Sequence, residues 1–131
     1  MNIHKSCTIN APRDAVWAAL TDPETIMRWG AGPALMAAVP GFEFSLWNGD
    51  IHGKVLEVDP GRSMLQEWYG GDWEAPSLVS FALIEEPEGA TRLELENTGV
   101  PDADGADIDA GWDDYYLRPI KELLEGGDSR A

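Results

Sequence analysis

The chain has 131 residues, of which 44% are apolar and 6 are tryptophan, which is enough for one ordinary domain with one core. Its 24 acidic residues outnumber its 9 lysines and arginines, and the formal net charge of -15 repels phosphate backbones and anionic bilayers. We therefore expect neither nucleic acid nor a membrane surface as a partner. The N-terminal stretch has no continuous apolar run typical of a signal peptide or membrane span, so we expect a cytoplasmic protein.

The N-terminal part of the chain predicts a strand followed by two short helices. Residues 3–9 alternate between apolar and polar side chains, as a strand does. Asn10 then offers an N-cap, with Pro12 in the first turn of a helix. A second polar residue followed by proline precedes another short helix at residues 24–29. Residues 30–41 are rich in Gly, Ala and Pro and predict a loop.

Beyond this loop the apolar period changes to two, which indicates a run of antiparallel strands. Asn48-Gly49 is a strong hairpin signal, because both central residues of a type I′ turn need positive φ. Pro60-Gly61 and Glu88-Gly89 mark two further turns. We expect strands at residues 42–47, 50–58, 63–69, 78–84 and 91–98.

The last periodic segment predicts one long amphipathic helix, which Gly126 and Gly127 end. Pro119 lacks the N–H that would bond to the carbonyl of Tyr115, so we expect a kink there. The apolar stripe of this helix consists of Ile108, Trp112, Tyr115, Tyr116, Pro119, Leu123 and Leu124.

These elements predict an α+β fold with one sheet and one long helix. The sheet must cover its apolar face, and only the C-terminal helix is long and apolar enough to do so. A twisted sheet wrapped around one helix closes imperfectly, which favours a cavity between them. We expect a single domain over residues 1–127 and a short tail at residues 128–131.

Several short motifs, in this order, resemble those of the C-terminal domain of the activator of the heat-shock-protein-90 ATPase. The N-terminal ones are Ala11-Pro12, Val16-Trp17, Thr21-Asp22-Pro23-Glu24 and Trp29. The later ones are residues 44–49, Gly53, Trp68, Trp73-Glu74, Gly99-Val100-Pro101 and residues 111–116.

This resemblance covers nearly the whole chain and implies a helix-grip fold: a curved antiparallel sheet of about six strands around a long C-terminal helix. It also implies membership of the START-type (SRPBCC) superfamily, whose members bind lipids, polyketides or other apolar ligands. Some members of the superfamily are cyclases or hydrolases. A chaperone is a second partner that the resemblance implies.

Aromatic side chains are the main candidates for a ligand site, because they can line a cavity and present a polar tip. His52 is the one polar candidate, and its position in a strand leaves its orientation open. Ordinary core packing is the competing interpretation for the aromatic residues, above all for Trp112. The candidate ligand-binding residues are Trp29, Trp47, His52, Trp68, Trp73, Phe81, Trp112 and Tyr116.

The sequence shows no sign of a metal or cofactor site. His4 and His52 are far apart, and Cys7, on the same face of its strand as Ile3 and Ile9, is best explained as a small buried hydrophobe. Nucleophile and phosphate-loop motifs are absent from the sequence. We therefore predict no catalytic residues and no cofactor.

The favoured interpretation is a non-enzymatic domain that binds an apolar or aromatic small molecule in its cavity. A second is a co-chaperone-like interaction module whose acidic surface meets a basic patch on a partner. A third is an enzyme of the cyclase or hydrolase type, which would need a buried acid-base pair.

Overall fold

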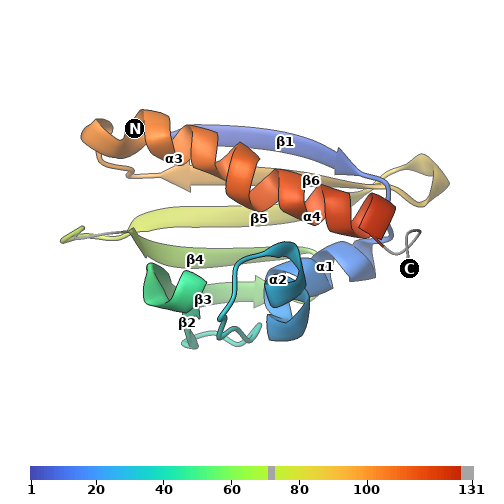
Figure 1. Ribbon diagram of the computed structural model, residues 1–131, viewed down its shortest axis with the longest axis horizontal. Helices are drawn as coiled ribbons and strands as arrows, with labels where there is room; N and C mark the ends of the chain where they lie inside the picture. The colour runs from blue at the N-terminus through green and yellow to red at the C-terminus, as the bar shows by residue number, and fades with distance from the viewer. Residues whose placement is uncertain (71–72, 128–131) are drawn as a thin grey trace.

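The computed structural model describes residues 1–70 and 73–127, and within these ranges six strands form one antiparallel sheet in the order β1-β6-β5-β4-β3-β2 (Figure 1). The predicted tail, residues 128–131, lies outside the described residues. The strands match the alternating segments of the sequence to within about one residue at each end. Their bounds are β1 (Ile3–Ile9), β2 (Glu43–Leu46), β3 (Ile51–Asp59), β4 (Ser63–Gly70), β5 (Ser77–Glu85) and β6 (Thr91–Thr98).

The turn between β2 and β3 forms at the predicted Asn48-Gly49 pair. Asn48 and Gly49 have φ values of 57° and 96°, and the N–H of Asp50 donates to the carbonyl of Trp47 across 3.2 Å. Trp47 itself has a φ of 50°, so it leaves the strand and starts the short segment η1 (Trp47–Gly49). The predicted strand at residues 42–47 is therefore too long, and its ladder ends at the Leu46–Ile51 pair.

Two short helices follow β1, as predicted. The cap assigned to Asn10 is wrong, because α1 (Arg13–Thr21) begins after Pro12, and Asn10 instead donates its N–H to Glu125 Oε2 across 2.7 Å. The second helix, α2 (Pro23–Trp29), has the cap that its sequence predicts. Its Asp22 carboxylate accepts a 3.2 Å hydrogen bond from the N–H of Thr25.

The loop at residues 30–41 runs along the outer edge of β2. Leu35 and Ser45 exchange two backbone hydrogen bonds of 2.9 and 3.0 Å, and the N–H of Trp47 donates to the carbonyl of Ala31 across 2.8 Å. The loop thus occupies backbone groups that this strand would otherwise present to solvent.

The C-terminal helix is continuous from Gly105 to Gly127 but irregular. Its segments are α3 (Gly105–Gly111), the π-helical η4 (Trp112–Leu117), α4 (Arg118–Glu122) and the π-helical η5 (Leu123–Gly127). In η4 the N–H of Arg118 donates to the carbonyl of Asp113, five residues back. A π-helical turn thus directly precedes α4, which contains Pro119, while the kink expected at Pro119 stays a prediction.

The π-helical turn changes which side chains of this helix face the sheet. Tyr115, which we expected in the apolar stripe, is 69% exposed. Leu117 and Ile120, which the expected stripe left out, are buried. A wider turn rotates the later residues relative to a regular 3.6-residue period, so a stripe drawn at that period places Tyr115 wrongly.

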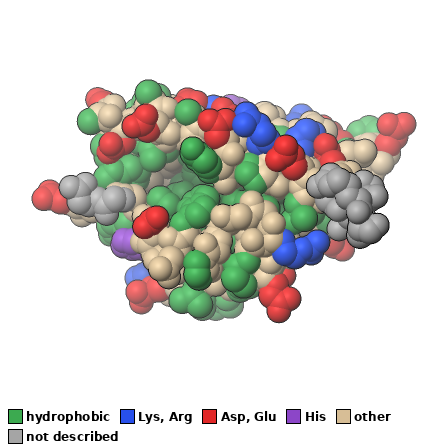
Figure 2. All heavy atoms as spheres, in the orientation of Figure 1, with side chains coloured by type: hydrophobic (Ala, Val, Ile, Leu, Met, Phe, Trp, Pro, Cys, Tyr) green, Lys and Arg blue, Asp and Glu red, His purple; other side chains and the backbone are tan. Residues whose placement is uncertain are grey.

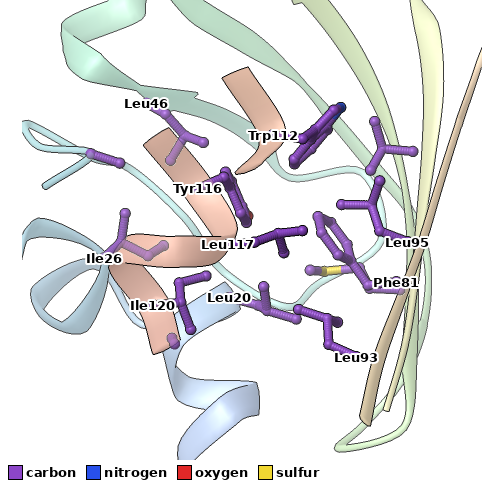
Figure 3. Close-up of a cluster of buried hydrophobic side chains, with 14 of the residues drawn as sticks. Leu20, Ile26, Leu46, Phe81, Leu93, Leu95, Trp112, Tyr116, Leu117 and Ile120 are labelled. Atoms are coloured by element: carbon purple, nitrogen blue, oxygen red, sulfur yellow. The ribbon is translucent and has the colours of Figure 1, made fainter. Parts of the chain in front are cut away.

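The C-terminal helix crosses one face of the sheet, and α1 and α2 cover the same face beyond it (Figure 1). Figure 3 shows side chains from the helix and from β5 and β6 meeting in one apolar cluster. Leu93 and Leu95 are fully buried on β6, while the intervening Glu94 lies on the other face, as its alternation predicts. The fold is therefore α+β, with the helix-grip arrangement that the family resemblance implies.

Polar contacts tie the helix to β1. Lys5 Nζ donates to Asp109 Oδ1 across 2.5 Å and to Asp113 Oδ2 across 2.9 Å. These hydrogen bonds, the one to Asp109 first, raise the pKa of Lys5 above its usual value. Further along, Lys121 Nζ donates to the carbonyl of Thr8 across 2.8 Å.

Cys7 lies on the face of β1 that carries Ile3 and Ile9, as expected, but it is only half-buried. Burial raises the pKa of its thiol, which keeps the sulfur protonated. Among the described helices, none has the length and apolar character that crossing a bilayer requires.

Candidate functional site

Six of the eight predicted site residues lie together in one array of aromatic rings. Tyr116, on η4, is at its centre, with ring centroids 4.7 Å from Trp29, 4.8 Å from Trp112 and 5.9 Å from both Trp68 and Phe81. The array extends outward from Trp29, whose ring is 6.3 Å from that of Trp47. These six predicted residues come from α2, η1, β4, β5 and η4: Trp29, Trp47, Trp68, Phe81, Trp112 and Tyr116.

Hydrogen bonds at the polar tips fix the two tryptophans that pack on each other, Trp68 and Trp112. Trp112 Nε1 donates to Asn97 Oδ1 across 3.1 Å, and Asn97 Nδ2 donates in turn to Ser77 Oγ across 3.0 Å. Trp68 Nε1 donates to Gln66 Oε1 across 2.6 Å. The buried polar residues of β4, β5 and β6 therefore orient the rings that the sheet and helix bring together.

A pocket of about 320 Å³ lies beside this array, between the start of the C-terminal helix and the β3–β4 part of the sheet. Figure 2 shows hydrophobic side chains gathered in a hollow on this face of the molecule. We call it the aromatic pocket, and its lining residues are Trp47, Asp50, Ile51, Trp68, Asp107, Ile108, Gly111, Trp112, Tyr115 and Tyr116.

Tyr116 lies deepest among the polar residues of the aromatic pocket, at 2% exposure. Burial raises the pKa of its phenol, so the group stays neutral over the physiological range. Tyr115 lies beside it in sequence yet is largely exposed, which places it at the mouth. The aromatic wall thus has a buried tyrosine at its inner end and an exposed one at its mouth.

A second hollow, of about 530 Å³, lies between β1 and the helix but is less suited to an apolar ligand. Charged side chains line much of it, including Asp113, Arg118 and Lys121. All three are already paired, Asp113 with Lys5, Arg118 with Asp114 and Lys121 with Glu125. We therefore take the smaller aromatic pocket as the candidate site.

The predicted site residues divide into three groups in the structure. Trp47, Trp68, Trp112 and Tyr116 line the aromatic pocket. Trp29 and Phe81 are buried behind them and support the ring array. The remaining two predicted residues, His52 and Trp73, lie outside both.

His52 is exposed on the opposite face of the sheet, where its ring stacks on Tyr69 at 5.2 Å. Trp73 is half-buried, and its Nε1 donates to Asp104 Oδ2 across 2.8 Å, which ties the segment after β4 to the segment before α3. The structure thus brings neither residue into the aromatic pocket.

Six lining residues were not among the predicted site residues. Ile108 and Tyr115 belonged to the expected helix stripe, so their spacing carried a partial signal. The spacing of Gly111 carried no such signal. A glycine helps to form a pocket because it has no side chain to fill the space. Asp50, Ile51 and Asp107 come close through the packing of the helix on the sheet, which local sequence patterns do not encode.

We also searched the described residues for side chains that could bind a metal ion. There, no group of three or more His, Cys, Asp or Glu side chains is placed to hold a metal ion. The aromatic pocket has two carboxylates among its lining residues, too few for a protein-built calcium site.

Two proteins similar to this chain come from yeasts. The chain is 26% identical over 127 residues to the uncharacterized protein C1711.08 of Schizosaccharomyces pombe, covering 96% of this chain and 38% of that protein. It is 24% identical over 127 residues to the Hsp90 co-chaperone AHA1 of Saccharomyces cerevisiae, covering 92% of this chain and 36% of that protein. The chain therefore spans little more than a third of either relative.

A solved structure extends this similarity to three dimensions. The HSP90 activator PFC0360w of Plasmodium falciparum superposes with a TM-score of 0.88 at 25% identity, covering 95% of this chain and 96% of that one. The family model described as "Activator of Hsp90 ATPase homolog 1-like protein" matches residues 10–125, nearly the whole chain. With this match and the helix-grip fold, the chain belongs to the Activator of Hsp90 ATPase homolog 1-like protein family.

Proposed function

We propose that this protein is a non-enzymatic binding domain that holds an apolar or aromatic small molecule in the aromatic pocket. The observation that carries the proposal is the pocket itself, about 320 Å³ in volume and walled by three tryptophans and two tyrosines. Its size is at the lower end of the roughly 300–1,000 Å³ typical of ligand sites. Burying an apolar ligand against these rings supplies the main driving force.

The rigidity of the inner wall supports binding in a preformed site. Trp68 and Trp112 are buried and hydrogen-bonded at their tips, so a ligand does not have to order them. A ligand would instead cover Tyr115 and the half-buried Trp47, the more exposed aromatic residues of the lining.

Native mass spectrometry of the purified protein tests the proposal, with tryptophan fluorescence as the readout for added aromatic probes. Gly111→Leu places a side chain in the pocket wall, where the first side-chain atom meets only Tyr115 Cδ2, at 3.9 Å. We expect it to abolish binding. Ala110→Leu adds a similar bulk at the neighbouring exposed position outside the lining and should leave binding intact.

Loss of binding in both variants, or in neither, would contradict the assignment to this pocket. Each variant is first checked for cooperative unfolding, so that a folding defect is not mistaken for a blocked site.

A co-chaperone-like interaction module is the second candidate, and the relatives named as Hsp90 co-chaperone and HSP90 activator favour it. With a net charge of -15, the chain would meet a basic patch on its partner. Pull-down of a purified Hsp90 at low and high salt tests this candidate. Capture that weakens with salt supports it, and no capture at low salt argues against it.

A further inference from the structure

The charged groups of the aromatic pocket all have one sign. Its lining includes the carboxylates of Asp50 and Asp107 but no lysine, arginine or histidine. Asp50 follows η1 at the start of β3, and Asp107 lies on α3, so the two acids come from the sheet side and the helix side of the pocket. Both residues are exposed, which places their carboxylates at the rim.

These two carboxylates are available to a ligand. Within the described residues, neither takes part in an ion pair or a side-chain hydrogen bond. Asp109 and Asp113, further along the same helix, are instead both bound to Lys5. The two acids that line the pocket thus have no cationic partner among the described residues.

The aromatic walls favour the same sign of charge. The face of an indole or phenol ring is electron-rich and attracts a cation within about 6 Å of its centre, with tryptophan the most effective. Trp47, Trp68 and Trp112 line the pocket and Tyr115 lies at its mouth. A cationic group entering between the rim acids is therefore next to electron-rich rings as well as carboxylates.

We propose, on the basis of the small-molecule binding proposed above, that the pocket selects lipophilic or aromatic cations, such as a ring system bearing a protonated amine. The apolar part packs against the tryptophans, and the ammonium group lies at the rim between Asp50 and Asp107. An apolar ligand with a carboxylate meets two like charges there and binds more weakly. Fatty acids are accordingly poor ligands.

Three probes with one ring system test this selectivity: 2-naphthylmethylamine, 2-naphthalenemethanol and 2-naphthoic acid. Their affinities are measured by titration calorimetry and tryptophan fluorescence at neutral pH. We expect the amine to bind about tenfold more tightly than the alcohol, and the acid more weakly than both. At about 1 M salt, where charges are screened beyond about 3 Å, the preference for the amine should shrink.

Two double variants locate the source of the preference. Asp50→Asn with Asp107→Asn should reduce the advantage of the amine to about twofold and leave the affinity of the alcohol unchanged. Glu96→Gln with Glu122→Gln removes the same amount of charge at exposed positions outside the pocket and should retain the tenfold preference.

The outcomes separate the selectivity from the binding function. If the alcohol binds and the amine binds no more tightly, the selectivity is wrong while ligand binding stands. If both double variants lose the preference equally, the overall charge of the protein causes it, and the role of Asp50 and Asp107 is wrong. If no probe binds at all, both the ligand-binding function and its selectivity are wrong.

Discussion

The two ends of the C-terminal helix make different contacts with the same sheet. Toward its end, Leu117 and Ile120 are buried in the central core with Phe81 (Figure 3). Toward its start, Ile108 is only half-buried, and Gly111 leaves a hollow of about 320 Å³. One element thus supplies stability at one end and open space at the other, and the change occurs across the π-helical η4.

Two matched truncations on this helix should show the largest contrast. Ile120→Ala removes a fully buried side chain and should lower the free energy of unfolding by about 2–5 kcal/mol. Ile108→Ala removes the same atoms from a pocket wall and should cost less than about 1 kcal/mol. Urea unfolding of both variants measures the difference, and equal losses would show that the two ends are packed alike.

The hydrogen bonds behind the pocket should carry the next largest effect. Asn97→Ala leaves the buried Nε1 of Trp112 without its acceptor and should lower the free energy of unfolding by about 1–3 kcal/mol. Thr98 is the next residue and lies on the other face of β6, so Thr98→Ala is the control and should change the free energy of unfolding little. A near-neutral Asn97 variant would mean that Trp112 finds another acceptor.

Gly111→Ala should increase stability while narrowing the pocket. Gly111 has helical backbone angles, φ -63° and ψ -37°, and an added Cβ meets only Tyr115 Cδ2 at 3.9 Å. Alanine is therefore accommodated and should raise the free energy of unfolding by about 0.5–1 kcal/mol. Denaturant unfolding checks the sign, and a loss of stability would show that the hollow is smaller than its geometry indicates.

The smallest effect concerns the tie between the helix and β1. Folding raises the pKa of Lys5, so its charged form stabilises the folded state. This stabilisation is fully present below the pKa that Lys5 has in the unfolded chain, and it is lost as pH rises through the pKa that Lys5 has in the folded protein. The difference in unfolding free energy between the wild type and Lys5→Gln should be at most about 1 kcal/mol at about pH 8 and should shrink as pH rises through the raised pKa of Lys5. A difference that grows with pH would contradict this sign.

Local patterns predicted most of the fold because its elements obey simple rules. Alternation gave the strands, and the pair Asn48-Gly49 placed the turn after β2. The errors came where tertiary contacts override local preference. Trp47 adopts a positive φ and packs on Trp29 instead of ending a strand, and the π-helical turn moves Tyr115 to the surface.

The sequence predicted less of the candidate site than of the fold. Residue type identified the aromatic residues as candidates, but alternation could not decide whether His52 faced the core, and the structure places it outside. The rim acids Asp50 and Asp107 are far apart in sequence and look like any other acids in a chain that has 24 of them. Only the tertiary fold, which places α3 across the pocket from the start of β3, brings them to one site.

The loop that covers β2 also limits how a protein partner can bind. Peptides often attach to a sheet by adding a strand to an exposed edge. Here the N–H and carbonyl of Ser45 are already bonded to Leu35, and on β1 the carbonyl of Thr8 accepts from Lys121. A partner could therefore not add a strand at Ser45 of β2, and the loop should also disfavour edge-to-edge aggregation along this strand.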